Sequence, residues 1–122
     1  MKKILIVVAN YYEDISNELL KSAKARLLKK SFSLKVIKVP GVFEIPVTIS
    51  KNIKKYDGFL ALGCVIKGET PHFNFISRAT TNSVMNLSVS SKKPIGNGLI
   101  TCFTKKQAIA RKKKGKEAAE AV

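Results

Sequence analysis

The chain is short of cysteine and has no long apolar run, and each shortage excludes a class of protein. Its two cysteines, Cys64 and Cys102, lie far apart in two apolar segments, which fits neither a metal motif nor a disulfide framework. We therefore expect two buried thiols in a reducing compartment, the cytoplasm. No apolar run approaches the roughly 20 residues of a transmembrane helix. We expect no membrane association.

Acidic residues are also scarce, with 8 Asp and Glu against 23 Lys and Arg, so the net charge is +15 at pH 7. A basic balance of this size suggests a nucleic-acid binder. However, only Arg26, Arg78 and Arg111 carry the guanidinium fork favoured for base and phosphate recognition. There is no RNA-binding aromatic pattern and no zinc spacing. We interpret the charge as a lysine-rich solvated surface and expect no nucleic-acid partner.

What the chain does have is a regular alternation of strand and helix patterns. Four apolar or alternating segments predict strands: residues 3–9, 33–39, 56–66 and 95–102. Helical spacing recurs at 13–30, at 42–55, from about 71 to just before 94, and at 105–122, where Gly115 is expected to divide the last helix. Such alternation predicts one domain over residues 1–122, an α/β fold with helices on both faces of a parallel sheet. The expected form is a flavodoxin-like three-layer αβα sandwich with strand order 2-1-3-4.

The stretch from residue 61 to 75 reads as a buried strand, a glycine turn and the start of a helix. Gly68 allows the sharp turn, Thr70 can cap the helix, and Pro71 suits its first position. The backbone N–H groups of Gly68, Glu69 and Thr70 would then lack helical partners, which makes an anion site. The single histidine, His72, falls beside it. Most turns of this type bind nothing, so the stretch alone does not establish a site.

In a parallel α/β sheet, ligands bind outside the carboxyl ends of the strands. That edge is expected to gather Tyr11, Phe43, Glu44 and Lys67 with the turn at 68–72. Each residue also has a plain structural interpretation: Phe43 as core, Tyr11 as a packed loop aromatic, and Glu44 as a partner of its own helix dipole.

Two motifs turn this edge into a family resemblance. GVFEIP at residues 41–46, followed by GCVIKGETPHF at 63–73, resembles the 6,7-dimethyl-8-ribityllumazine synthase family. The likeness continues in ILIVVANYYEDI near the start, PIGNGLIT at 94–101, QAIAR at 107–111 and KGKEAAEAV at the end. It covers nearly the whole chain.

The resemblance implies an enzyme that condenses 5-amino-6-(D-ribitylamino)uracil with 3,4-dihydroxy-2-butanone 4-phosphate, releasing phosphate and water. It implies no metal and no organic cofactor. It also implies a homo-oligomer with active sites between neighbouring subunits, either a pentamer or twelve pentamers in a 60-subunit shell. The N-terminus lacks the arm that often pairs with a neighbouring subunit, so we expect the pentamer.

The resemblance also assigns residues. His72 would be catalytic, as an imidazole suited to proton transfer near neutral pH. The phosphate would be bound by Gly68, Glu69, Thr70, Arg111 and Lys114, with Arg111 supplied by the adjacent subunit. The pyrimidine and ribityl chain would be bound by Tyr11, Phe43, Glu44, Ile45, Val65, Ile66, Lys67 and Asn97.

The chain departs from the family pattern at several points. Asn97 stands where the pattern commonly has Phe, which would make the site more polar. The segment between Arg111 and Lys114 is shorter than usual, and the usual acidic residue near Phe103 is missing. Three alternatives stay open: a flavodoxin-like binder of flavin or nucleotide without catalysis, a basic nucleic-acid binder, and a purely structural pentamer.

Overall fold

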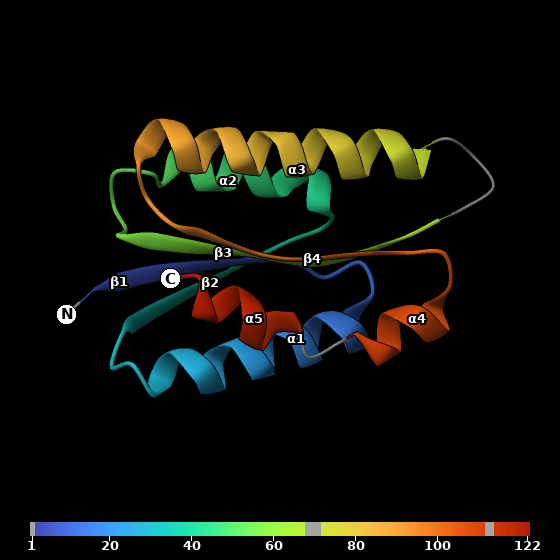
Figure 1. Cartoon of the computed structure of the whole chain (residues 1–122), viewed down its shortest axis with the longest axis horizontal. Coiled ribbons are helices and arrows are strands. Elements are labelled where there is room, and N and C mark those ends of the chain that lie inside the picture. Colours follow the sequence, from blue (N-terminus) through green and yellow to red (C-terminus); the bar gives the residue numbers. More distant parts are fainter. Residues whose placement is uncertain (1, 68–71, 112–113) are drawn as a thin grey trace.

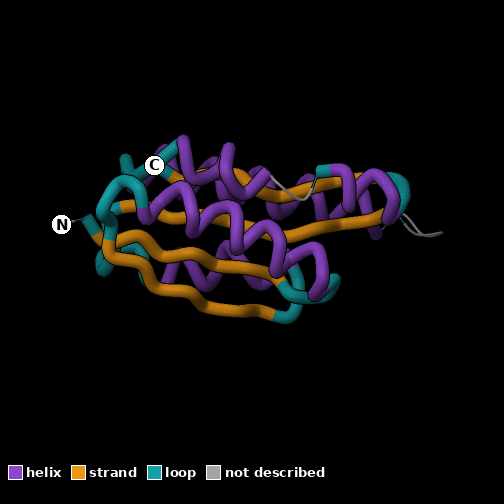
Figure 2. The backbone as a smooth tube through the Cα atoms, turned by 90° about the horizontal axis from the view of Figure 1, so that it is seen from below, coloured by secondary structure: helices purple, strands orange, loops and turns teal. Residues whose placement is uncertain are grey.

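The computed structural model describes residues 2–67, 72–111 and 114–122. Four parallel strands form one sheet in the order β2-β1-β3-β4. Figure 2 shows these strands side by side, with helices in front of and behind them. The strands are β1 (Lys3–Ala9), β2 (Ser33–Val39), β3 (Gly58–Ile66) and β4 (Ile95–Cys102). The predicted parallel sheet and its strand order are confirmed.

Helices cover both faces of this sheet (Figure 1). One face carries the 3₁₀ turn η1 (Val42–Glu44), α2 (Ile45–Lys51) and α3 (His72–Ser91). The other carries α1 (Glu13–Leu28), α4 (Lys105–Ala110) and α5 (Lys114–Glu120). The three-layer αβα arrangement is the flavodoxin-like fold expected from the sequence.

Two apolar clusters fill the two spaces between sheet and helices, because successive side chains of a strand point to opposite faces. In β1, Ile4, Ile6 and Val8 pack toward α1 and α5. Leu5 and Val7 pack toward α2 and α3. Both faces are therefore buried, which explains the nearly unbroken apolar runs of β1 and β3.

Two helices and one strand have boundaries that differ from the sequence prediction. The first helix ends at Leu28 rather than at residue 30, and Ser31 then has a φ of 59°, which turns the chain toward β2. The segment predicted as a helix over 42–55 is a 3₁₀ turn followed by a seven-residue α-helix that ends at Lys51. The β3 strand begins at Gly58, two residues later than expected.

The last helical segment is divided, as predicted, but the division does not lie at Gly115. The chain forms α4 up to Ala110, and Gly115 lies inside α5, where it is buried. Glycine is a weak helix residue in isolation, but here tertiary packing outweighs that preference. No helix in the described parts of the chain is long and apolar enough to cross a membrane.

Candidate active site

The carboxyl ends of the strands are tied together by backbone hydrogen bonds. Just beyond β1, the amide of Asn10 donates to the carbonyl oxygen of Val39 at the end of β2, at 3.0 Å. Just beyond β3, the amide of Lys67 donates to the carbonyl oxygen of Cys102 at the end of β4, at 2.9 Å. The loops that follow the strands therefore start from a fixed edge.

Gly63 allows the segment after β2 to approach β3 closely. A Cβ atom at Gly63 would lie 2.7 Å from Cγ1 of Val42 and 3.2 Å from Cβ of Ala9. Because glycine has no side chain, buried Val42 can pack over β3 at this point. This contact brings the next two residues, Phe43 and Glu44, to the carboxyl edge of β1 and β3.

Phe43 and Glu44 both offer side-chain groups to a ligand at that edge. The Phe43 ring is 64% exposed, so it is not the core residue that its apolar character allowed. Glu44 is the N-cap residue of α2, yet among the described residues its side chain makes no capping hydrogen bond. Its carboxylate lies over Gly41, with Oε2 3.2 Å from where a Cβ of Gly41 would be. A flat ring and a free acceptor thus stand next to each other.

The two tyrosines after β1 form a second aromatic element. Tyr11 is 76% exposed, and its ring meets Tyr12 edge to face with centroids 4.9 Å apart. Tyr12 packs against the apolar cluster beneath α1, and burial raises the pKa of its hydroxyl. Tyr12 therefore anchors Tyr11 while leaving the Tyr11 ring open to solvent.

The end of β3 supplies a strip of backbone beside these aromatic rings. Val65 packs toward the α2 and α3 side and Ile66 toward the α1 side. Lys67 follows, exposed, with its ammonium nitrogen 5.3 Å from the centroid of the Phe103 ring. A cation above an aromatic face is held there by the quadrupole of the ring.

Two residues of the predicted set lie elsewhere. Ile45 is fully buried in the core, so only its backbone is available to a ligand. Asn97 is exposed in the middle of β4, opposite Ala61 rather than Val65. Its side-chain Oδ1 accepts a hydrogen bond from the backbone amide of Leu99, at 3.0 Å. Asn97 pairs with Ala61, which lies four positions before Val65 in β3.

Arg111 ends α4 and turns back on the end of β4. Its guanidinium donates to the carbonyl oxygen of Thr101 at 3.4 Å and lies 3.8 Å from Sγ of Cys102. The amide of Lys114, the first residue of α5, donates to the carbonyl oxygen of Arg111 at 3.1 Å. The two predicted phosphate-binding cations are therefore joined through their backbone.

The predicted anion turn of Gly68, Glu69 and Thr70 lies outside the described residues, as does Pro71. His72 is the first residue of α3, and its side chain is also outside the description. The structure therefore leaves their predicted roles as predictions. The described chain leads to the turn at Lys67 and resumes at α3, on the same edge of the sheet (Figure 1).

A groove of about 400 Å³ adjoins Phe43 and Glu44. Its opposite wall is formed by residues of α3, which the sequence did not predict as part of a site. The groove is lined by Phe43, Glu44, Pro46, Val47, Ala79, Thr80 and Ser83. Thr80 is 2% exposed, and its hydroxyl finds no hydrogen-bond partner among the residues that the structure describes. Thr80 lies four residues from both Ile76 and Val84, within the apolar stripe of α3. A polar residue in an apolar stripe is the sequence feature that could have indicated this wall of the groove.

Both cysteines are buried free thiols, as predicted. Burial, with neighbouring Cys102, raises the pKa of the Cys64 thiol to about 12, so this thiol stays protonated at neutral pH. Within the described ranges, no three His, Cys, Asp or Glu side chains gather as a metal site.

Comparison with known proteins agrees with the motifs at this edge. The family model described as 6,7-dimethyl-8-ribityllumazine synthase matches residues 1–122. A protein of that name from Bartonella tribocorum is 44% identical over 126 residues, covering 97% of this chain and 83% of the relative. One from Bartonella bacilliformis is 44% identical over 118 residues, covering 93% and 78%.

A third relative is 6,7-dimethyl-8-ribityllumazine synthase 1 from Rhodopseudomonas palustris, 43% identical over 120 residues. The alignment covers 93% of this chain and 74% of that protein. Identity at this level over nearly the whole chain, together with the family match, means that this chain belongs to the 6,7-dimethyl-8-ribityllumazine synthase family.

Proposed function

We propose that the carboxyl edge of β1 and β3 binds the substrates of the lumazine synthase reaction. This transferase reaction of riboflavin biosynthesis condenses 5-amino-6-(D-ribitylamino)uracil with 3,4-dihydroxy-2-butanone 4-phosphate. It is the reaction of the family to which the chain belongs. Residues 1–122 act as one catalytic domain in this proposal.

The observation that carries the proposal is the packing of Val42 over Gly63. It brings the exposed side chain of Phe43 and the carboxylate of Glu44 to the end of β3. Among the described residues, this carboxylate makes no capping hydrogen bond to α2. A pyrimidine stacks on such a ring and is read by backbone groups of Val65 and Ile66. The ribityl hydroxyls donate to the Glu44 carboxylate, which as an ion only accepts hydrogen bonds. Tyr11 adds a second aromatic face.

The phosphate end of the second substrate goes to the turn at residues 68–70, with Arg111 and Lys114 as its cationic partners. The amine of the pyrimidine attacks the ketone carbonyl, and loss of water forms a Schiff base. Phosphate is eliminated, and ring closure with loss of water gives the lumazine. His72 moves protons in these steps, because its unperturbed pKa lies near neutrality. Holding two reactive substrates together supplies much of the rate.

The proposed assembly is a homopentamer with active sites shared between neighbours. Large apolar side chains are exposed on one side of the molecule, over η1, α2 and α3: Phe43, Val47, Phe75, Met85 and Val89. An exposed apolar face of this kind marks a surface that another chain covers. A neighbouring copy on this face would bring its own Arg111 and Asn97 toward the Phe43 edge. We also propose a cytoplasmic location, which suits the two free thiols.

The test is to mix both substrates with purified protein and follow the fluorescence of the lumazine. Formation well above the spontaneous rate is expected, with one phosphate released per lumazine. A protein that turns yellow with flavin but leaves the rate at the spontaneous level would overturn the proposal.

A further inference from the structure

The last helix is fitted against the rest of the molecule at both of its ends, through glycines. At its far end, a Cβ atom on Gly96 of β4 would stand 2.0 Å from the carbonyl oxygen of Ala118. At its near end, a Cβ atom on Gly115 would stand 2.0 Å from the carbonyl oxygen of Leu19 in α1. Real Cβ contacts are never this short, so no side chain fits at either place.

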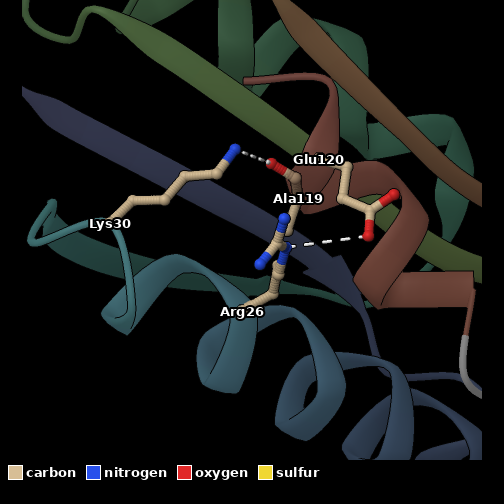
Figure 3. A network of polar contacts seen from close by, with 4 residues as sticks. All are labelled: Arg26, Lys30, Ala119 and Glu120. Atoms are coloured by element: carbon tan, nitrogen blue, oxygen red, sulfur yellow. Dashed lines mark hydrogen bonds and ion pairs between the residues drawn. The ribbon is translucent and has the colours of Figure 1, made fainter.

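The far end is also held by two side chains, one from α1 and one from the turn that follows it (Figure 3). Arg26 pairs with Glu120 at 3.6 Å, and the ammonium of Lys30 donates to the carbonyl oxygen of Ala119 at 3.4 Å. Both cations sit at the C-terminal end of α5, where the helix dipole favours positive charge. These contacts hold the C-terminal end of the helix and do not touch its first residue.

The near end is different because it carries the candidate phosphate ligands. Lys114 precedes Gly115, and its amide donates to the carbonyl oxygen of Arg111. The Arg111 guanidinium in turn donates to Thr101. A continuous set of contacts thus runs from the Leu19 carbonyl through Gly115 and Lys114 to Arg111.

We propose that Gly115 is a positioning residue for the phosphate ligands of this enzyme. Its missing side chain lets α5 rest on the backbone of α1, and this contact sets the place of Lys114 and, through the Lys114 amide, of Arg111. The inference rests on the proposed function, since it acts through residues that bind the phosphate there.

The geometry says what a methyl group would do. Leu19 contributes a backbone oxygen within a helix, which cannot move independently, whereas the nearby Ser22 hydroxyl can rotate away. The start of α5 must therefore move off α1 by roughly an ångström in a close-packed interior. A displacement of that size at a ligand group costs up to about a hundredfold in activity.

The experiment compares Gly115→Ala with Gly96→Ala, a matched control that strains the other end of the same helix. Steady-state kinetics are measured with each substrate varied in turn, at a temperature where circular dichroism shows both variants folded. Gly115→Ala is expected to raise the KM for 3,4-dihydroxy-2-butanone 4-phosphate by about tenfold and the KM for the pyrimidine by less than about twofold. Gly96→Ala is expected to change both KM values by less than about twofold.

A multiple-mutant cycle asks whether Gly115 acts through the two cations Lys114 and Arg111. In a background that carries both Lys114→Ala and Arg111→Ala, adding Gly115→Ala is expected to change the KM for the phosphorylated substrate by less than about threefold, because both groups that it positions are already gone. A full further tenfold increase would mean a general structural effect and would overturn the proposal. Equal KM changes in Gly115→Ala and Gly96→Ala would do the same.

If Gly115→Ala does not fold, Ser22→Val tests the same contact from α1. It adds bulk beside Gly115 and keeps the glycine, so a rise of about threefold in the same KM is expected. No change in that KM overturns the inference while leaving the proposed function intact. A wild-type protein that forms no lumazine overturns the proposed function, and the inference with it.

Discussion

The guanidinium of Arg111 donates a hydrogen bond to the carbonyl oxygen of Thr101, near the carboxyl end of β4. A cation is thereby held beside the sheet edge where ligands bind in parallel α/β folds. Arg111 is exposed, and the structure gives it no carboxylate partner among the described residues, so its fork is available to an anion.

Replacing Arg111 with alanine should raise the KM for 3,4-dihydroxy-2-butanone 4-phosphate by about 10- to 100-fold, because a charge-assisted hydrogen bond to phosphate is lost. The KM for the pyrimidine should stay nearly constant. Arg78→Ala, which removes another exposed arginine on α3, is the control for loss of charge alone. An unchanged KM for the phosphorylated substrate in Arg111→Ala would remove Arg111 from the phosphate site.

Replacing His72 with alanine should lower kcat by about 10- to 100-fold and no further, because proximity of the substrates supplies much of the rate. Rates at saturating concentrations of both substrates, with Lys116→Ala as the control, check this. A variant that keeps the wild-type kcat would exclude proton transfer by His72.

The sequence predicted the sheet better than the helices, and the reason is physical. The β1, β2 and β4 strands begin and end where their apolar or alternating patterns do, because those patterns reflect which side chains the sheet buries. The effect of Gly115 was mispredicted because a glycine usually interrupts a helix. Here the close contact with the backbone of Leu19 requires a glycine within α5. Local propensity does not contain that contact.

The sequence indicated the edge of the sheet at which part of the candidate site lies. Phe43 and Tyr11 are exposed and Glu44 is half-buried there, because they lie in the segments that follow β1 and β2. Asn97 lies nearer to the amino end of β4 than expected. Thr80, which lines the groove, was not among the predicted site residues. The motifs say which residues take part, but they do not say which surface of the protomer each one occupies or which copy supplies it.

The exposed apolar face over α3 is expected to be buried in the pentamer, so a charged residue introduced there should disrupt the assembly. Light scattering should give about five times the mass of the chain for the wild type. Val89 is 73% exposed, and Val89→Lys should shift the mass toward the monomer, because a charge cannot be buried unpaired in an interface. Leu28→Lys, 64% exposed on α1 at the other face, should leave the assembly unchanged. A monomeric wild type, or an unaffected Val89→Lys, would contradict the pentamer.

The Cys64 thiol predicts an alkaline loss of stability. Burial raises its pKa from 9.0 to about 12, so in this window the unfolded chain releases the proton and the folded chain keeps it. The contribution is complete below pH 9 and is lost as the pH rises toward 12, at up to about 1.4 kcal/mol per pH unit. Urea unfolding of the wild type and Cys64→Ala at pH 8 to 10.5 measures it. Parallel pH dependences in the two proteins would show that Cys64 does not contribute.

In the proposed site, the pyrimidine lies at the end of β3 between Phe43 and the Val65–Ile66 backbone. The decisive experiment is a crystal or cryo-electron-microscopy structure with 6,7-dimethyl-8-ribityllumazine bound. We expect the ring system to stack on Phe43, with the ribityl hydroxyls within hydrogen-bonding distance of the Glu44 carboxylate. A lumazine bound away from the carboxyl ends of the strands, with Phe43 and Glu44 untouched, would contradict it.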